Sequence, residues 1–156
     1  MNVAPIVITF TNQIDGAEKL VQSAHKFGWH TELLITKGPY PGANKKFKTI
    51  IQSIPRLRDR GYTHIVSVDA FDTLVFGNTQ AFLGKLHDHS WPSLVIAAET
   101  NLYPDKSRLH EYPDTKTRYK FINSPFILDI TKSIPEGFTD IGEDDDQRHM
   151  CNWYLD

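Results

Sequence analysis

Residues 5–36 read PIVITFTNQIDGAEKLVQSAHKFGWHTELLIT, and this stretch decides the fold. Residues 5–10 are β-branched and nearly all apolar, which is typical of a strand buried on both faces. After a polar turn, apolar residues recur at helical spacing, and these are Ala17, Leu20, Val21, Ala24 and Phe27. Gly28 then ends the helix, and residues 31–36 form a second short strand. Strand, helix and strand at this spacing predict a βαβ unit in a parallel sheet.

The remaining residues continue this alternation of strands and helices. Further elements are expected as helices near 47–57, 79–87 and 150–154 and as strands at 64–68, 94–98 and 121–128. The sequence therefore predicts an α/β fold, a Rossmann-like and mostly parallel sheet with flanking helices. Its 156 residues are expected to form one domain, 1–156.

Two prolines and one long loop interrupt the pattern. Pro55 is expected to kink or split the helix near 47–57. Pro125 lies inside the strand expected at 121–128, so that strand should be an edge strand or contain a bulge. Residues 100–120 show no periodicity, and a loop of this length in a compact domain is often a lid or a binding loop.

Composition excludes several classes of protein. The formal net charge is −2, so no basic field favours nucleic acid or an anionic membrane. The apolar runs are far shorter than the roughly 20 residues that span a bilayer, and no signal segment precedes the first of them. The single cysteine, Cys151, fits a reducing compartment. We therefore expect a cytoplasmic protein with no membrane and no nucleic-acid partner.

Asp69 and Asp72 stand where the third expected strand ends. Ligands of open α/β sheets bind beyond the carboxyl ends of the strands. Two carboxylates three residues apart on a tight turn can both reach one hard cation such as Mg²⁺ or Mn²⁺. The alternative is a turn with two solvated aspartates, of which Asp72 caps the following segment.

Several segments of the chain, taken in order, resemble the glycosyltransferase domain of the procollagen-lysine dioxygenase-like family (lysyl hydroxylases and collagen glycosyltransferases). The matching segments are Val7-Ile8-Thr9-Phe10, Ile14-Asp15-Gly16, Pro41-Gly42-Ala43-Asn44-Lys45, Val68-Asp69-Ala70-Phe71-Asp72-Thr73, Ala97-Ala98-Glu99, Tyr103-Pro104-Asp105, Lys120-Phe121-Ile122-Asn123-Ser124-Pro125-Phe126-Ile127, Asp144-Asp145-Asp146-Gln147 and Tyr154-Leu155-Asp156. The resemblance covers nearly the whole chain.

The resemblance implies a GT-A fold and a glycosyltransferase that moves a sugar from a nucleotide-diphosphate sugar, a UDP-sugar, to a hydroxyl acceptor. It implies Mn²⁺ or Mg²⁺ held by Asp69 and Asp72, with the ring of Phe71 stacked on the base where the family has Tyr. The implied donor contacts are Thr9, Lys45, Phe71, Asn123 and Ser124, and the implied catalytic residues are Asp144, Asp145, Asp146 and Asn123. The acceptor, a protein or a saccharide, is not identified.

Several of these residues also have a structural explanation. Lys45 could instead be a solvated charge at the start of a helix, and Asn123 and Ser124 suit a turn or strand edge. Residues 144–146 form an acidic run at a helix N-terminus, which the helix dipole favours without any ligand.

The chain departs from the family pattern at two places. Pro125 replaces a Gly-Gly pair, which changes the backbone beside the sugar. The family's domain also continues past the position of Asp156, and a histidine there completes its metal site. We therefore expect a domain that is short at its C-terminus, either a fragment or a shortened protein whose metal site is completed in another way.

Two alternatives stay open at this stage. A truncated domain could bind a nucleotide sugar without turnover. A haloacid-dehalogenase-like phosphatase also places an aspartate at a strand end before Thr-Leu, as in Asp69 to Leu74, but its nucleophile follows the first strand of the domain, and its second aspartate comes two residues later.

Overall fold

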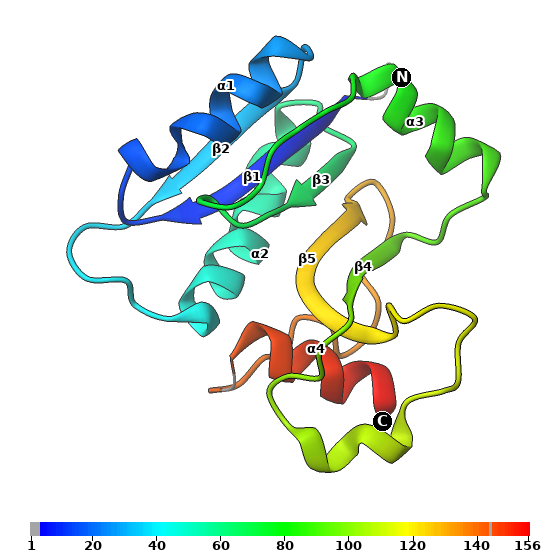
Figure 1. The fold of residues 1–156 in the computed structure, drawn as a ribbon. Coiled ribbons are helices and arrows are strands. Elements are labelled where there is room, and N and C mark those ends of the chain that lie inside the picture. Colours follow the sequence, from blue (N-terminus) through cyan, green and yellow to red (C-terminus); the bar gives the residue numbers. More distant parts are fainter. Residues whose placement is uncertain (1–3, 144) are drawn as a thin grey trace.

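The computed structural model describes residues 4–143 and 145–156, which form one five-stranded sheet with helices around it (Figure 1). The strands are β1 (Pro5–Thr11), β2 (His30–Ile35), β3 (His64–Ser67), β4 (Leu94–Glu99) and β5 (Phe121–Asp129). The helices are α1 (Glu18–Lys26), α2 (Ala43–Asp59), α3 (Thr79–Asp88) and α4 (Asp146–Leu155), with short 3₁₀ helices η1 (Asp15–Ala17) and η2 (Lys106–Glu111).

The sheet has the order β2-β1-β3-β5-β4. β1 pairs in parallel with β2 and β3, whereas β5 is antiparallel to both of its neighbours. β4 therefore runs in the same direction as β1, β2 and β3, and β5 alone is reversed. The expected α/β fold with a mostly parallel sheet and flanking helices is confirmed.

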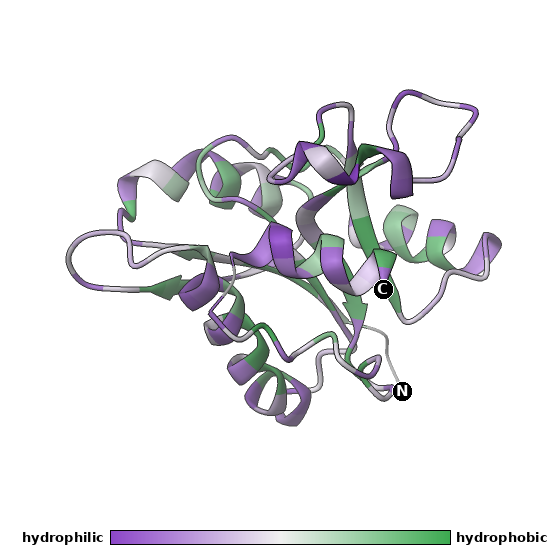
Figure 2. Ribbon diagram, turned by 90° about the horizontal axis from the view of Figure 1, so that it is seen from below, coloured by the Kyte–Doolittle hydropathy of each residue, from purple (hydrophilic) through white to green (hydrophobic). Residues whose placement is uncertain are grey.

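Helices pack on both faces of β1, whose seven residues are all buried. Ile6 and Ile8 point into the larger apolar cluster with Phe47 and Ile50 of α2. Val7 points to the other face, into a smaller cluster that α1 helps to form. In Figure 2 the strands carry much of the hydrophobic colour, whereas the helices alternate between hydrophobic and hydrophilic residues. The continuous apolar run of β1 thus fits a central strand covered on both faces.

The two prolines have different consequences. α2 runs unbroken from Ala43 to Asp59 with Pro55 inside it, so the helix is not split. Its buried stripe, which includes Ile54 and Leu57, packs continuously on the sheet across the proline.

Pro125 lies in a bulge of the interior strand β5, because the pairing steps from Ile96↔Phe126 to Ala97↔Asn123. The proline has no partner residue there, so its missing N–H costs no ladder bond. Of the two expected alternatives, the bulge is confirmed.

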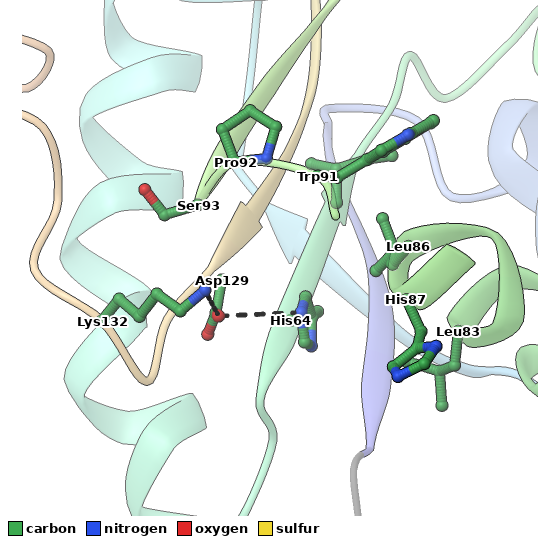
Figure 3. A pocket seen from close by; sticks show the side chains of 10 residues that line it. His64, Leu83, Leu86, His87, Trp91, Pro92, Ser93, Asp129 and Lys132 are labelled. Carbon is green, nitrogen blue, oxygen red and sulfur yellow. Dashed lines mark ion pairs between the residues drawn. The ribbon is translucent and has the colours of Figure 1, made fainter. Parts of the chain in front are cut away.

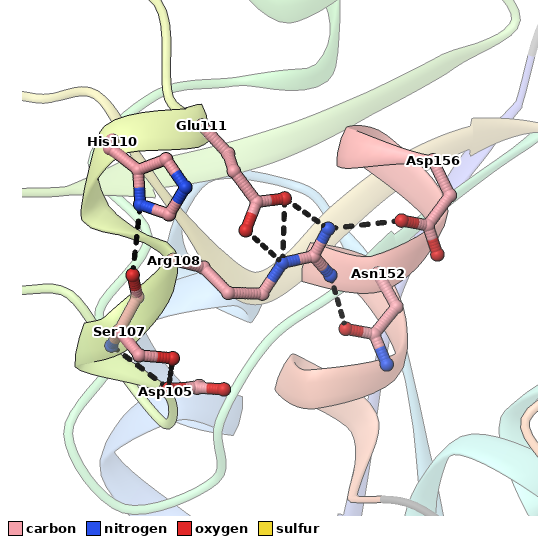
Figure 4. Close-up of polar contacts among 7 residues, drawn as sticks. All are labelled: Asp105, Ser107, Arg108, His110, Glu111, Asn152 and Asp156. Atoms are coloured by element: carbon pink, nitrogen blue, oxygen red, sulfur yellow. Dashed lines mark hydrogen bonds and ion pairs between the residues drawn. The ribbon is translucent and has the colours of Figure 1, made fainter.

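The loop of residues 100–120 is attached to the C-terminal helix through Arg108 in η2 (Figure 4). Its guanidinium group donates to both carboxylate oxygens of Glu111, to Asn152 Oδ1 at 2.8 Å and to Asp156 Oδ1 at 2.9 Å. A planar guanidinium with this many acceptors fixes the geometry of the contact. The middle of the loop is therefore held against α4.

Among the described residues, none of the helices is long and apolar enough to cross a membrane.

Candidate functional site

A cleft of about 500 Å³ opens beyond the carboxyl ends of β1 and β3. Its lining residues are Phe10, Asn12, Gln13, Tyr40, Lys46, Asp69, Ala70, Phe71 and Asp72. This is the edge where open α/β sheets bind their ligands. Both aspartates proposed from the sequence therefore lie in one cleft, together with Phe71.

Thr9 holds the segment that carries Asp69 in place. The Thr9 side chain is buried, and its hydroxyl donates to the carbonyl of Val68 at 2.7 Å. The backbone N–H of Val68 donates to the carbonyl of Ile8, which extends the β1–β3 pairing beyond the end of β3. Thr9 is not a lining residue of the cleft, and its hydroxyl already has a protein acceptor.

Lys46, which the sequence reasoning missed, is the central cation of the cleft. Its ammonium group lies 3.1 Å from Asp69 Oδ1, 2.6 Å from Asp146 Oδ2 and 3.4 Å from the hydroxyl of Ser124. Burial by itself would lower the pKa of Lys46, but the charges and hydrogen bonds of Asp146 and Asp69 outweigh burial and raise it. Lys46 is therefore a charged, oriented donor that joins α2, the turn after β3, and α4.

Lys45 and Lys46 differ because they lie on different sides of α2. Lys46 begins a buried stripe that continues through Ile50, Ser53 and Leu57, at positions i, i+4, i+7 and i+11. Lys45 is exposed and is not a lining residue of the cleft. The helical spacing was thus the signal that could have selected Lys46, whereas the family motif selected its neighbour.

Two half-exposed aromatic rings line the cleft. Phe71 is 55% exposed, and a Cβ added at Gly16 would overlap its ring. Tyr40 is 47% exposed and meets Phe10 edge-on, with ring centroids 6.0 Å apart. Burial raises the pKa of the Tyr40 hydroxyl. Lys46 opposes this rise and the carboxylates of Asp146 and Asp69 add to it, so the hydroxyl stays protonated. Each ring leaves a large apolar surface open to a ligand.

The acidic run before α4 divides into different roles. Asp145 is the N-cap of α4, and its carboxylate accepts the backbone N–H of Arg148 at 2.7 Å. Asp146 is buried, pairs with Lys46 and accepts the backbone N–H of Gln147 at 2.9 Å. Burial raises the pKa of Asp146 even though Lys46 opposes that change. Asp144 lies outside the described residues.

The β5 bulge brings Ser124 towards the cleft. Ser124 is buried, with its hydroxyl near Lys46, whereas the side-chain oxygen of Asn123 accepts the backbone N–H of Ser124 at 2.9 Å. The turn chemistry considered for Asn123 is therefore present. Neither residue lines the cleft as the structure stands.

The residues around Asp69 and Asp72 fit a hard cation in part. Both offer carboxylate oxygens, the preferred ligands of Mg²⁺ and Mn²⁺, and both line the same cleft. Within residues 4–143 and 145–156, no group of three or more His, Cys, Asp and Glu side chains could hold a metal ion. Among the described residues the two aspartates are thus the carboxylate ligands available to a cation, and phosphate oxygens and water are further ligands that such cations accept.

The α/β fold, with a mostly parallel sheet and a cleft beyond its strand ends, is consistent with a glycosyltransferase domain of the GT-A type. Residues 2–156 match the family described as the PLOD GT domain, and the chain belongs to this family. It is thus a glycosyltransferase domain, and the resemblance seen in the motifs is confirmed.

Relatives from three animals show the same similarity. A multifunctional procollagen lysine hydroxylase and glycosyltransferase of Caenorhabditis elegans is 27% identical over 169 aligned residues, which cover 97% of this chain and 22% of the relative. The corresponding human protein, LH3, is 23% identical over 164 residues, with the same coverage of 97% and 22%. A procollagen-lysine,2-oxoglutarate 5-dioxygenase of Drosophila melanogaster is 24% identical over 119 residues, or 74% of this chain and 16% of the relative. The chain therefore spans a quarter or less of the length of these curated relatives.

Family membership also removes one alternative. A haloacid-dehalogenase-like phosphatase would carry Asp69 after the first strand of its domain, but here Asp69 follows β3, the third strand in the chain.

Proposed function

We propose that this domain binds a nucleoside diphosphate sugar, with UDP as the nucleotide, and transfers the sugar to a hydroxyl acceptor with a divalent cation, Mn²⁺ or Mg²⁺, at Asp69 and Asp72. The observation that carries the proposal is the meeting of Asp69, Lys46 and Asp146 at one cleft. These three groups come from separate elements, and the cleft lies at the ligand-binding edge of the sheet.

The diphosphate belongs at the charged end of the cleft. The cation, when bound, supplies charge neutralisation for the leaving diphosphate. Lys46 is the protein's own donor to the phosphate oxygens, since its ammonium group is charged and its side chain, 13% exposed, lines the cleft. We therefore assign the phosphate contact to Lys46 in place of Lys45.

The base belongs against the aromatic residues. Phe71 offers the stacking face that the family motif implies, and Gly16 leaves room for its ring. Tyr40 provides a second ring and a hydroxyl in the same cleft. Thr9 stabilises this region indirectly. Its hydroxyl bonds the carbonyl of Val68 and so fixes the turn that bears Asp69 and Phe71.

The sugar and the acceptor belong near the bulge of β5 and the start of α4. Ser124 and Asp146 already meet Lys46 there, so both lie one contact from the proposed phosphate site. Asp146 orients Lys46, and Asn123 and Asp145 shape the bulge and the helix end. Asp144 stays a predicted catalytic residue from the motif alone. The names of the relatives join procollagen lysine hydroxylation to glycosyl transfer, so a hydroxylated lysine side chain is the first acceptor to test.

A non-catalytic nucleotide-sugar-binding domain is the second candidate. It is favoured by the small number of protein ligands, two carboxylates, that the described residues bring to the cation. Such a site holds a cation loosely, whereas transfer needs the leaving group fixed in one geometry. The cytoplasm stays the predicted compartment for either candidate.

One assay separates the candidates. UDP release is measured with UDP-glucose, UDP-galactose and UDP-N-acetylglucosamine, with Mn²⁺, and with or without a hydroxylysine peptide. Acceptor-dependent release that Asp69→Asn abolishes supports transfer, and the exposed aspartate of α3 gives the matched control Asp88→Asn. UDP binding without release supports the non-catalytic candidate. If neither binding nor release occurs, the proposed function is wrong.

A further inference from the structure

A second pocket, of about 320 Å³, lies at the opposite edge of the sheet from the cleft and shares no lining residue with it (Figure 3). His64 is the first residue of β3 and pairs in register with Asp129, the last residue of the antiparallel strand β5. Asp69 follows the other end of β3. The two sites are therefore separated by the length of this strand.

The walls of this second pocket are apolar. Leu83 and Leu86 come from α3, Trp91 and Pro92 from the turn before β4, and Ile127 from β5. α3 contains no buried residue, so its two leucines at the pocket are open to a ligand and not enclosed in the core. Small-molecule sites combine such apolar walls with a few convergent polar groups.

The polar groups of the pocket include a carboxylate that is already satisfied. Oδ1 of Asp129 accepts the backbone N–H and the hydroxyl of Thr131 at 3.0 and 2.6 Å, and Oδ2 lies 3.1 Å from the ammonium of Lys132. The side chain of Asp129 is 11% exposed. Lys132 is 59% exposed and uses only part of its donor capacity on this pair, so its remaining ammonium protons are open to a ligand.

His64 supplies a second donor. Its Nδ1 lies 3.0 Å from the Thr63 hydroxyl, which also accepts the backbone N–H of Ala4. A hydroxyl that already accepts can donate its own proton to Nδ1, which leaves the ring proton on Nε2. A protonated ring also carries a proton on Nε2. Burial lowers the pKa of His64 although Asp129 opposes this, so the ring is neutral when the pocket is empty.

Nε2 of His64 has room for a ligand. Its contact with Asp129 Oδ2 is 3.9 Å long, which is beyond hydrogen-bond range. The side chain of His64 is 18% exposed and lines the pocket. The pocket thus presents Nε2 of His64 and the ammonium of Lys132 as neighbouring donors, together with the exposed ring of His87. Its one lining carboxylate, Asp129, is already bonded by Thr131 and Lys132.

We propose that this pocket binds a small monocarboxylate, with its apolar body against Leu83, Leu86 and Trp91 and its carboxylate between His64 and Lys132. These donors, with the one lining carboxylate already bonded, favour an anionic head, and charge-assisted hydrogen bonds are the strongest available there. The volume is at the lower end of the usual range for ligand sites, which limits the body to about one ring. Binding is independent of the nucleotide site.

The test is a titration of the 156-residue chain with 3-phenylpropionate, followed by ¹⁵N-resolved NMR, with 3-phenylpropionamide as the neutral isostere. Saturable shifts are expected at Trp91 and Ile127, with a Kd below about 1 mM, and the amide should bind at least tenfold more weakly. Lys132→Met should remove most of this preference for the acid. Lys85→Met, an exposed lysine of α3 that does not line the pocket, should retain it.

Three results would overturn the proposal. These are the absence of saturable shifts, shifts that map to the cleft around Asp69, and equal binding of acid and amide. Leu86→Glu provides an independent check, because a carboxylate in the apolar wall should abolish binding of 3-phenylpropionate. If 3-phenylpropionate shifts the Trp91 signal of Leu86→Glu as much as that of the wild type, the ligand lies elsewhere and the proposal is wrong.

Discussion

Replacing Lys46 by Met tests the charged centre of the cleft through its effect on stability. The substitution keeps an unbranched apolar stem and removes the ammonium group that lies 2.6 Å from Asp146 and 3.1 Å from Asp69. The side chain of Asp69 is 45% exposed, so water replaces most of that interaction. The side chain of Asp146 is 7% exposed, and its carboxylate would lose its only cationic partner among the described residues.

The expected loss in free energy of unfolding is about 2–4 kcal/mol at neutral pH. Removing one partner of a buried ion pair costs about 3–5 kcal/mol, because the other charge stays buried. The loss is smaller here because Asp146 keeps its bond from the N–H of Gln147 and can also take up a proton. Lys45→Met, on the exposed side of the same helix turn, should change stability by less than about 0.5 kcal/mol.

The deficit should depend on pH in a defined direction. Burial raises the pKa of Asp146 and Lys46 opposes it, so losing Lys46 raises that pKa further. A carboxyl group with a raised folded-state pKa binds more protons in the folded state, so stability falls as the pH rises above about 4. Urea unfolding of Lys46→Met should therefore show a smaller deficit at pH 5 than at pH 8. Equal losses for Lys45→Met and Lys46→Met, or a deficit that grows towards low pH, would refute this reasoning.

Five further substitutions, at Phe71, Gly16, Thr9 and Arg108, test the site and the loop held against α4. Phe71→Ala should weaken UDP binding by about 1–3 kcal/mol in calorimetry, Phe71→Tyr should not, and Gly16→Ala should reproduce part of the loss because its Cβ overlaps the ring. Thr9→Val should cost about 1–2 kcal/mol in urea unfolding, because it leaves the carbonyl of Val68 without its 2.7 Å donor. Unchanged stability with weaker UDP binding would instead make Thr9 a direct ligand contact. Arg108→Met should release the loop of residues 100–120, and limited proteolysis should then cut there severalfold faster than in the wild type.

Much of the fold was predictable because it depends on local patterns. The buried run of β1 and the helical spacing of residues 17–27 predict a βαβ unit, and the structure contains it. The reversal of β5 was not predictable in this way, because strand direction depends on pairing with residues far away in the chain. The effect of Pro125 was also ambiguous, since a bulge and an edge strand both remove the need for its N–H.

The part of the site that lies directly after a strand could be predicted from the sequence. Asp69, Asp72 and Phe71 come directly after β3 and line the cleft together. Lys46 was missed because the motif was aligned by position along the sequence. Which of the two lysines reaches the cleft depends instead on the side of α2 that faces it. The separation of Asp145 from Asp146 into a helix cap and a buried ion-pair partner depends on the start of α4, which the acidic run alone does not reveal.

Calorimetric titration with UDP, in Mn²⁺ and in EDTA, tests the divalent-cation site at Asp69 and Asp72 most directly. The wild-type chain should bind at least tenfold more tightly in Mn²⁺, a difference of about 1.4 kcal/mol or more, because the cation joins the carboxylates to the diphosphate. Asp72→Asn should lose that gain, and Asp88→Asn, an exposed aspartate of α3 away from the cleft, should keep it. Equal UDP affinity in Mn²⁺ and EDTA, or full Mn²⁺ dependence in Asp72→Asn, would contradict the proposed metal site.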